Sequence, residues 1–299
     1  IIVTSAEDKP YVEHIIENLF SHIIHTPQPE FEYSLKYKNP WEFDSINKNG
    51  NILIVSLEYP EDSTGDFLMK RFANKNKIDE SVFILEDVYS KSQLICGIQS
   101  QDAISMGKDM IKNGDWIKNE IRNMIEYRMT VEIYKHGKNP PLSKKMLKYF
   151  GATLDLQPDY VIIKEDSLKP FLWIGRAYPY RWISVHKSYK EKYIAKNKVF
   201  DHYRTDMSEL IPDIKISEHF QNLEYSQNGL KKHPIIRGLY EHENSESGGP
   251  FFVYIFETES VNEVILVSGF VNYPGRDKIL LLKQLELIAK TLNKGESYK

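Results

Sequence analysis

The chain has 299 residues, of which 27% are charged and 41% hydrophobic, and its formal net charge is −3. This composition is that of a folded globular protein and argues against a disordered chain. Lysine and arginine are interspersed with aspartate and glutamate, so the sequence has no basic patch and we expect no nucleic-acid partner. No apolar run approaches the roughly 20 residues that are needed to cross a bilayer.

The first half of the chain combines predicted helices and strands. Apolar residues recur at helical spacing from Val12 to Ile24, with Asp8 and Pro10 as start signals and Pro27 as a stop, and predict an amphipathic helix. The later pattern predicts strands over residues 51–58, 82–87 and 93–98, a short helix over 62–72 and a long helix over 101–134.

The only cysteine, Cys96, lies in the apolar run L-I-C-G-I. A single cysteine excludes an intrachain disulfide and a multi-cysteine metal site. Because its neighbours are apolar, we predict a buried and unreactive thiol.

A cluster of helix-breaking residues, K-H-G-K-N-P-P at residues 135–141, lies near the middle of the chain. It predicts a boundary between an N-terminal α/β lobe, residues 1–137, and a C-terminal α+β lobe, residues 138–299.

The second half contains most of the predicted strands. They cover residues 153–164, 171–176, 182–186, 235–243, 251–257 and 263–272, with helices at 143–149 and 277–292 and a polar, partly helical stretch at 190–227. Short polar turns between neighbouring strands favour antiparallel pairing. The expected fold class is α+β, with two lobes of mainly antiparallel sheet and amphipathic helices packed on their faces.

The segment W-I-G-R-A-Y-P-Y-R-W, from Trp173 to Trp182, is the densest cluster of aromatic residues and arginine in the chain. Tyrosine, tryptophan and arginine dominate binding hot spots, although large aromatic residues also form cores. We expect the two tryptophans to face the core. The predicted exposed binding residues are the other four: Arg176, Tyr178, Tyr180 and Arg181.

Sequence signatures of catalysis and metal binding are missing. The chain has neither a G-x-S-x-G nucleophile motif nor a G-x-x-x-x-G-K-[ST] phosphate loop. Glu241 and Glu243 would share one side of a strand while His242 points to the other, which argues against a three-ligand site. We therefore expect no metal and no cofactor.

Two pairs of carboxylates, Glu257 with Glu259 and Asp201 with Asp206, are of a kind common on acidic surfaces. A glycosidase would need two such groups facing each other across a cleft, which the sequence does not establish.

Several segments together resemble a known family. They are T-P-Q-P-E-F-E-Y from Thr26, N-I-L-I-V-S-L from Asn51, G-A-T-L-D-L-Q-P-D-Y from Gly151 and G-G-P-F-F-V-Y-I-F-E from Gly248. In order and approximate spacing they resemble bacterial cell-envelope lipoproteins, mostly from Bacteroidetes, that are classified as domain of unknown function 4837. The segments are mainly core and turn positions.

The resemblance implies a periplasmic or surface-facing location and a lipid anchor on an N-terminal cysteine. The chain begins at Ile1 without such a cysteine, so we expect an N-terminal segment to precede it. We expect a non-catalytic binding or scaffold module for an envelope protein or glycan. The alternative is a hydrolase of envelope or carbohydrate substrates, with acidic residues and histidine in a cleft between the lobes.

Overall fold

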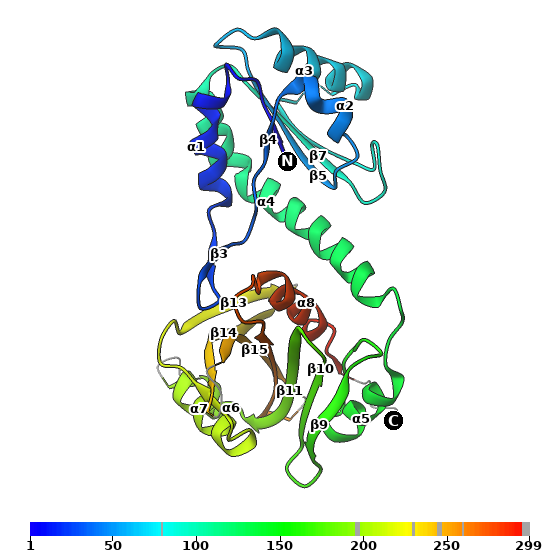
Figure 1. Cartoon of the computed structure of the whole chain (residues 1–299), viewed down its shortest axis with the longest axis vertical. Coiled ribbons are helices and arrows are strands. Elements are labelled where there is room, and N and C mark those ends of the chain that lie inside the picture. The colour runs from blue at the N-terminus through cyan, green and yellow to red at the C-terminus, as the bar shows by residue number, and fades with distance from the viewer. Residues whose placement is uncertain (79, 195–197, 229–230, 244–246, 259, 295–299) are drawn as a thin grey trace. The chain divides into compact units, whose positions relative to one another are not determined.

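The computed structural model describes residues 1–78, 80–194, 198–228, 231–243, 247–258 and 260–294. Contacts between residues divide the chain into two compact units (Figure 1). Unit 1 comprises Ile1–Ile23 and Phe31–Met129, and unit 2 comprises Ile24–Glu30 and Thr130–Lys299. The division falls inside helix α4 (Ala103–Tyr134), ahead of the predicted boundary after residue 137.

Unit 1 is built on a mixed five-stranded sheet. Its strands, in the order β4-β1-β5-β7-β6, are β4 (Tyr37–Lys38), β1 (Ile2–Val3), β5 (Asn51–Leu57), β7 (Leu94–Ser100) and β6 (Val82–Glu86). Neighbours are parallel except β6 and β7. The prediction of a mainly antiparallel sheet is therefore wrong for this lobe. The connections from β1 to β4 and from β4 to β5 contain helices and return the chain so that these strands run in the same direction.

Helices cover both faces of this sheet. The core on one face is shared with α1 (Lys9–Phe20) and α4 and contains Ile16 and Cys96. The core on the other face is shared with α2 (Phe43–Ile46) and α3 (Ser63–Asn76), which follow the short η1 (Pro40–Glu42). The burial predicted for Cys96 is confirmed, and burial raises the pKa of its thiol to about 12.

Two details of the N-terminal prediction differ from the structure. The first helix ends at Phe20, and Ile23 and Ile24 belong instead to β2 (Ile23–His25), which pairs with β3 (Pro29–Phe31). Helix α4 continues through Gly107 and Gly114 without a break, so neither glycine interrupts it.

Unit 2 contains an eight-stranded sheet in which every pair is antiparallel, as predicted, and which curls on itself in Figure 1. The order β12-β14-β15-β16-β11-β10-β9 comprises β12 (Ile214–Ile216), β14 (Lys231–His242), β15 (Gly248–Glu257), β16 (Glu263–Asn272), β11 (Tyr180–Tyr189), β10 (Phe171–Arg176) and β9 (Val161–Asp166). Strand β13 (Asn222–Asn228) also pairs with β14.

The strand predicted over residues 153–164 is not one element. Its start forms β8 (Ala152–Thr153), which pairs with β17 (Asn293–Lys294), and β9 begins only at Val161. Between them Pro158 lies in a turn that the Tyr160 N–H closes on the Gln157 carbonyl, and a turn of this kind ends a strand.

Helices α7 (Val199–Leu210) and α8 (Ile279–Ala289) pack on opposite faces of this sheet. The Tyr203 hydroxyl of α7 donates to Ser268 Oγ, whereas Leu285 of α8 lies over Gly269, the next residue of β16. The α6 helix (Lys190–Ile194) precedes α7, and α5 (Pro140–Phe150) packs on β8. None of the described helices combines the length and apolar character that a membrane span requires.

Strand β11 lies in the middle of the sheet, paired with β10 on one side and β16 on the other. Because side chains alternate along a strand, its even-numbered residues face α7 and its odd-numbered residues face α8. This alternation positions both surfaces described below.

Candidate functional site

Three aromatic rings form a stacked row that runs from the core of unit 2 to its surface. The Trp173 ring is buried, the centroid of Trp182 lies 5.9 Å from it, and the centroid of Tyr180 lies 5.7 Å from Trp182 at an interplanar angle of 8°. Gly175 leaves space for this row, because a Cβ there would lie 2.3 Å from Trp182 Cδ1. We call the row the aromatic ladder.

The outer end of the ladder is a group of exposed tyrosines. Tyr180 is 44% exposed and Tyr178 is 60% exposed. The Tyr178 ring packs edge-on against both Tyr180 and Tyr273, at centroid distances of 5.6 Å and 5.4 Å. Two of the predicted binding residues, Tyr178 and Tyr180, are thus brought together at the surface, and Trp173 lies in the core as expected.

The two predicted arginines do not join this surface. Arg181 is buried, and its Nη1 donates to Gln284 Oε1 at 2.8 Å. Burial also lowers the pKa of its guanidinium. The expected exposure of Arg181 is wrong because strand β11 begins at Tyr180, so alternation places the next residue on the α8 face. Arg176 is held by Gln157 and by an ion pair with Asp159.

The Glu241–Glu243 segment takes the alternating arrangement that the sequence predicts. Glu241 and Glu243 are exposed, and Glu243 forms an ion pair with Lys215 at 2.8 Å. The His242 ring packs edge-on against Trp182. Within the described residues no three acidic, histidine or cysteine side chains gather as a metal site would require.

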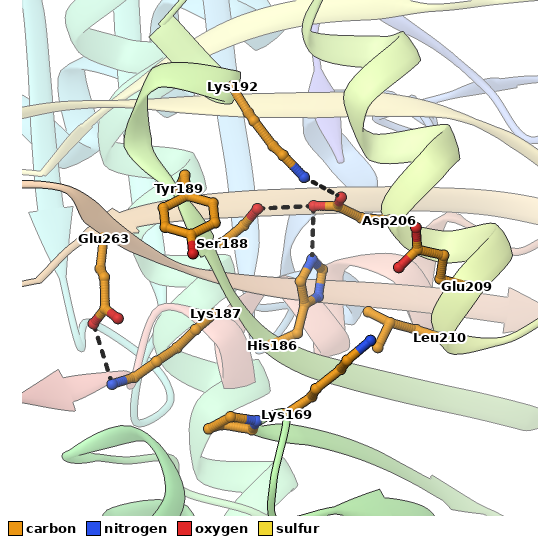
Figure 2. A pocket seen from close by; sticks show the side chains of 11 residues that line it. Lys169, His186, Lys187, Ser188, Tyr189, Lys192, Asp206, Glu209, Leu210 and Glu263 are labelled. Atoms are coloured by element: carbon orange, nitrogen blue, oxygen red, sulfur yellow. Dashed lines mark hydrogen bonds and ion pairs between the residues drawn. The ribbon is translucent and has the colours of Figure 1, made fainter.

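A second surface feature of unit 2 is a pocket of about 350 Å³ (Figure 2). It is lined by the β9–β10 loop, the end of β11, α6, α7 and the start of β16. His186 of β11 and Asp206 of α7 lie in its wall. We call it the His186 pocket.

Asp206 is surrounded by hydrogen-bond donors. Its Oδ2 accepts from Ser188 Oγ and from the Tyr193 hydroxyl, both at 2.9 Å, and its Oδ1 accepts from Lys192 Nζ at 2.9 Å. Burial alone would raise the pKa of this carboxyl, but His186 and these donors hold the pKa well below its usual range. Asp206 is therefore a carboxylate at any physiological pH.

The imidazole of His186 is buried, with its side chain 3% exposed. Its Nε2 lies 3.8 Å from Asp206 Oδ2, which is within reach of an ion pair but too long for a hydrogen bond. Neither ring nitrogen has a hydrogen-bond partner in the described part of the chain.

The comparison with protein families identifies a family for most of unit 2. The model of the family described as Domain of unknown function (DUF4837) matches residues 139–291, just over half of the chain. The chain belongs to the DUF4837 family. The DUF4837 domain contains the aromatic ladder, the exposed tyrosines and the whole His186 pocket.

No curated protein matches the sequence. Among solved structures, a crystal structure from Bacteroides thetaiotaomicron VPI-5482 is similar to half of the chain, with 9% sequence identity and a TM-score of 0.31. The matched part spans 46% of that protein.

Sequence reasoning missed the His186 pocket of the DUF4837 domain. His186 appeared only as the last residue of a predicted strand, and Asp206 only in a surface pair with Asp201. The buried positions Val199, Tyr203 and Met207 place Asp206 at the edge of the buried face of α7, but only the fold brings that face to β11. Glu259, of the other carboxylate pair, lies outside the described residues.

Proposed function

We propose that this protein is a non-catalytic binding module of the bacterial cell envelope, and that the exposed tyrosines at the end of the aromatic ladder contact a glycan. The observation that carries the proposal is the row of rings Trp173, Trp182 and Tyr180, which extends from the buried core to exposed side chains.

Exposed tyrosine rings suit the apolar face of a sugar, and their hydroxyl groups suit its polar edge. Since Tyr180 is stacked on Trp182 and Tyr178 packs on Tyr273, these rings are held before any ligand arrives. Binding to side chains that are already ordered loses less conformational entropy. The same features would serve a protein partner, which is the second outcome of the experiment below.

The envelope location rests on the resemblance to Bacteroidetes lipoproteins. We propose that an N-terminal lipid anchor tethers the protein and that the membrane is contacted only through that anchor. Fractionation of cells that express the full-length precursor tests this point, and recovery of the protein in the cytosolic fraction would contradict it.

The test of binding uses isolated envelope polysaccharide and envelope extract from the source cells. We expect co-sedimentation of the protein with the polysaccharide, and about tenfold weaker binding for the Tyr178→Ala/Tyr180→Ala double variant, since each aromatic contact contributes roughly 0.5–1.5 kcal/mol. Tyr11→Ala is the matched control, because Tyr11 is 50% exposed and lies in unit 1.

Equal binding by the double variant and the control would reject the tyrosines as the contact surface. Retention of an envelope protein in place of polysaccharide, with the same dependence on Tyr178 and Tyr180, would assign the surface to a protein partner.

The hydrolase alternative draws support from one observation, the presence of His186 and Asp206 in one pocket. This pocket lies within unit 2, whereas the sequence-based hypothesis placed the site between the lobes. Ser188 Oγ donates to Asp206, so it is not aligned for activation by His186. Because its lowered pKa and its donors make Asp206 a poor proton carrier, we favour binding over catalysis. Turnover of a glycan library that Asp206→Asn abolishes would reverse this preference.

A further inference from the structure

The His186 pocket is separate from the aromatic ladder. Tyr180 and His186 are six residues apart on β11, which corresponds to about 20 Å at 3.3 Å per residue. A ligand in this pocket is therefore a second ligand, and its recognition does not depend on the tyrosines.

The buried histidine is the feature that points to a ligand. Buried polar atoms in native proteins nearly always have a hydrogen-bond partner. Asp206, whose Oδ2 lies 3.8 Å from Nε2, already accepts three hydrogen bonds at 2.9 Å, and the ring is too far away to form a fourth. Because His186 lines the pocket, a ligand with hydroxyl groups can supply the hydrogen-bond partners that the two ring nitrogens lack in the protein.

The lysines and carboxylates that line the pocket are equal in number. Three ammonium groups line it, from Lys169, Lys187 and Lys192, and three carboxylates face them, from Asp206, Glu209 and Glu263. Two of the lysines are already engaged, Lys192 with Asp206 at 2.9 Å and Lys187 with Glu263 at 3.4 Å. Because the charges of these lysines and carboxylates cancel, they favour neither an anion such as phosphate nor a cation.

One charge of each sign is available for hydrogen bonding at the rim. Lys169 and Glu209 are both exposed, and neither forms an ion pair with any of the described residues. Figure 2 shows both side chains on the side of the pocket that Leu210 also lines. Leu210 and Pro170 add apolar surface between these polar groups.

The volume of about 350 Å³ lies at the lower end of the range for ligand pockets, roughly 300–1,000 Å³. This size suits one ring with its substituents and is small for a nucleotide. Alternating donors and acceptors with small apolar surfaces match a ring that carries several hydroxyl groups, each of which donates and accepts.

We propose that the His186 pocket binds a neutral polyhydroxylated small molecule, a monosaccharide or a cyclic polyol, with the imidazole of His186 as its central hydrogen-bond partner and Lys169 and Glu209 at the rim.

The experiment observes the imidazole directly. Side-chain nitrogen NMR spectra of the protein are recorded during titration with glucose, galactose, N-acetylglucosamine and myo-inositol, and in parallel with inorganic phosphate and with glycine as a zwitterion. The His186 resonances are assigned by their loss in His186→Gln. We expect a saturable shift of these resonances with at least one of the four polyols and none with phosphate or glycine.

Variants at the rim keep the test valid if His186→Gln does not fold. Glu209→Ala alters an exposed side chain and should lower the affinity for the polyol about tenfold. This is the effect expected from the loss of a hydrogen bond to a charged group. Tyr11→Ala, which alters a half-exposed side chain of unit 1, should leave the affinity unchanged, and observing His186 itself makes the result independent of the proposed function. The proposal is overturned if none of the four polyols gives a saturable shift, if phosphate or glycine gives one, or if Glu209→Ala binds as tightly as the wild type.

Discussion

A buried carboxyl in unit 1 should make the stability of that unit depend on pH. Asp8 precedes α1 and is fully buried, and its Oδ2 accepts a hydrogen bond from the Leu57 N–H at 3.0 Å. Burial, with a smaller contribution from the neighbouring Asp62 carboxylate, raises the pKa of Asp8 to about 7 against the opposing effect of the Leu57 N–H. Asp62 itself caps α3 by accepting from the Gly65 N–H.

The sign of the effect follows from linkage. The folded protein keeps the proton on Asp8 up to about pH 7, whereas the unfolded chain loses it near pH 4. The stabilisation is fully present below about pH 4 and is lost as the pH rises to about 7. At 1.36 kcal/mol per pKa unit, the shift of about three units corresponds to about 4 kcal/mol.

Asp8→Asn should remove this dependence. The amide oxygen can accept from Leu57 as the carboxyl does, and the amide N–H can replace the acidic proton toward Asp62. We expect the variant to match the wild type near pH 4 and to exceed its free energy of unfolding by up to about 4 kcal/mol at pH 8.

The assay is hydrogen exchange against denaturant, followed on peptides from β5, because a chain of two units does not unfold in one step. Asp44→Asn is the control, since the Asp44 side chain is 76% exposed. Asp62→Asn should retain most of the pH dependence because burial is the largest cause of the shift. The reasoning fails if Asp8→Asn loses stability between pH 4 and pH 8 as steeply as the wild type does.

Three further predictions concern other positions. Gly249→Ala should destabilise unit 2 by about 3 kcal/mol or more in thermal unfolding, because the added Cβ would lie 1.9 Å from the Val271 carbonyl oxygen. Gly107→Ala, its control, adds a Cβ to a helix with no atom within 4 Å and should stabilise by up to about 1 kcal/mol. The Cys96 thiol, with its pKa raised to about 12, should react with a thiol reagent at pH 8 only as fast as unit 1 opens, so a rapid reaction without denaturant would contradict its burial. Glu30→Gln should lower the free energy of unfolding of unit 2 by about 1 kcal/mol in chemical denaturation, and by less at high salt. The reason is that the Glu30 carboxylate accepts hydrogen bonds from backbone N–H groups at the start of α8. An unchanged denaturation midpoint would exclude that role.

Local patterns predicted the long central strands of unit 2 well, because these strands are continuously apolar or alternate and their turns are polar. They did not predict β12 or β13, which lie in the stretch expected to be partly helical. Strand β10 matches its predicted range, residues 171–176, and β16 matches residues 263–272. Local patterns did not predict the direction of strand pairing in unit 1, which depends on the connections between the strands. The parallel pairing of β1 with β5 joins residues about 50 positions apart, and no local pattern in either strand indicates its direction.

At the candidate site, too, local patterns gave the alternation of side chains along a strand but not the contacts between distant elements. Extending the predicted strand back from Trp182 to Tyr180 would have placed Arg181 on the face opposite the tyrosine, so this error was avoidable from the sequence. The contact between His186 and Asp206 was not predictable from the sequence, because β11 and α7 are separated by α6 and by residues outside the described ranges. Contacts of that kind depend on how a helix packs on a sheet.

One strand supports both proposed binding surfaces. All ten residues of β11 pair with β16, and six of them also pair with β10, so the strand has hydrogen-bonded neighbours on both sides. Strands in such positions are among the last parts of a protein to open. Tyr180 and His186 lie on the same face of this strand. His186 is paired on both sides and Tyr180 is paired with β16, so neither can shift without breaking that pairing. The two surfaces therefore gain rigidity from a single element, which is the arrangement expected where recognition depends on side chains held in place before a ligand binds.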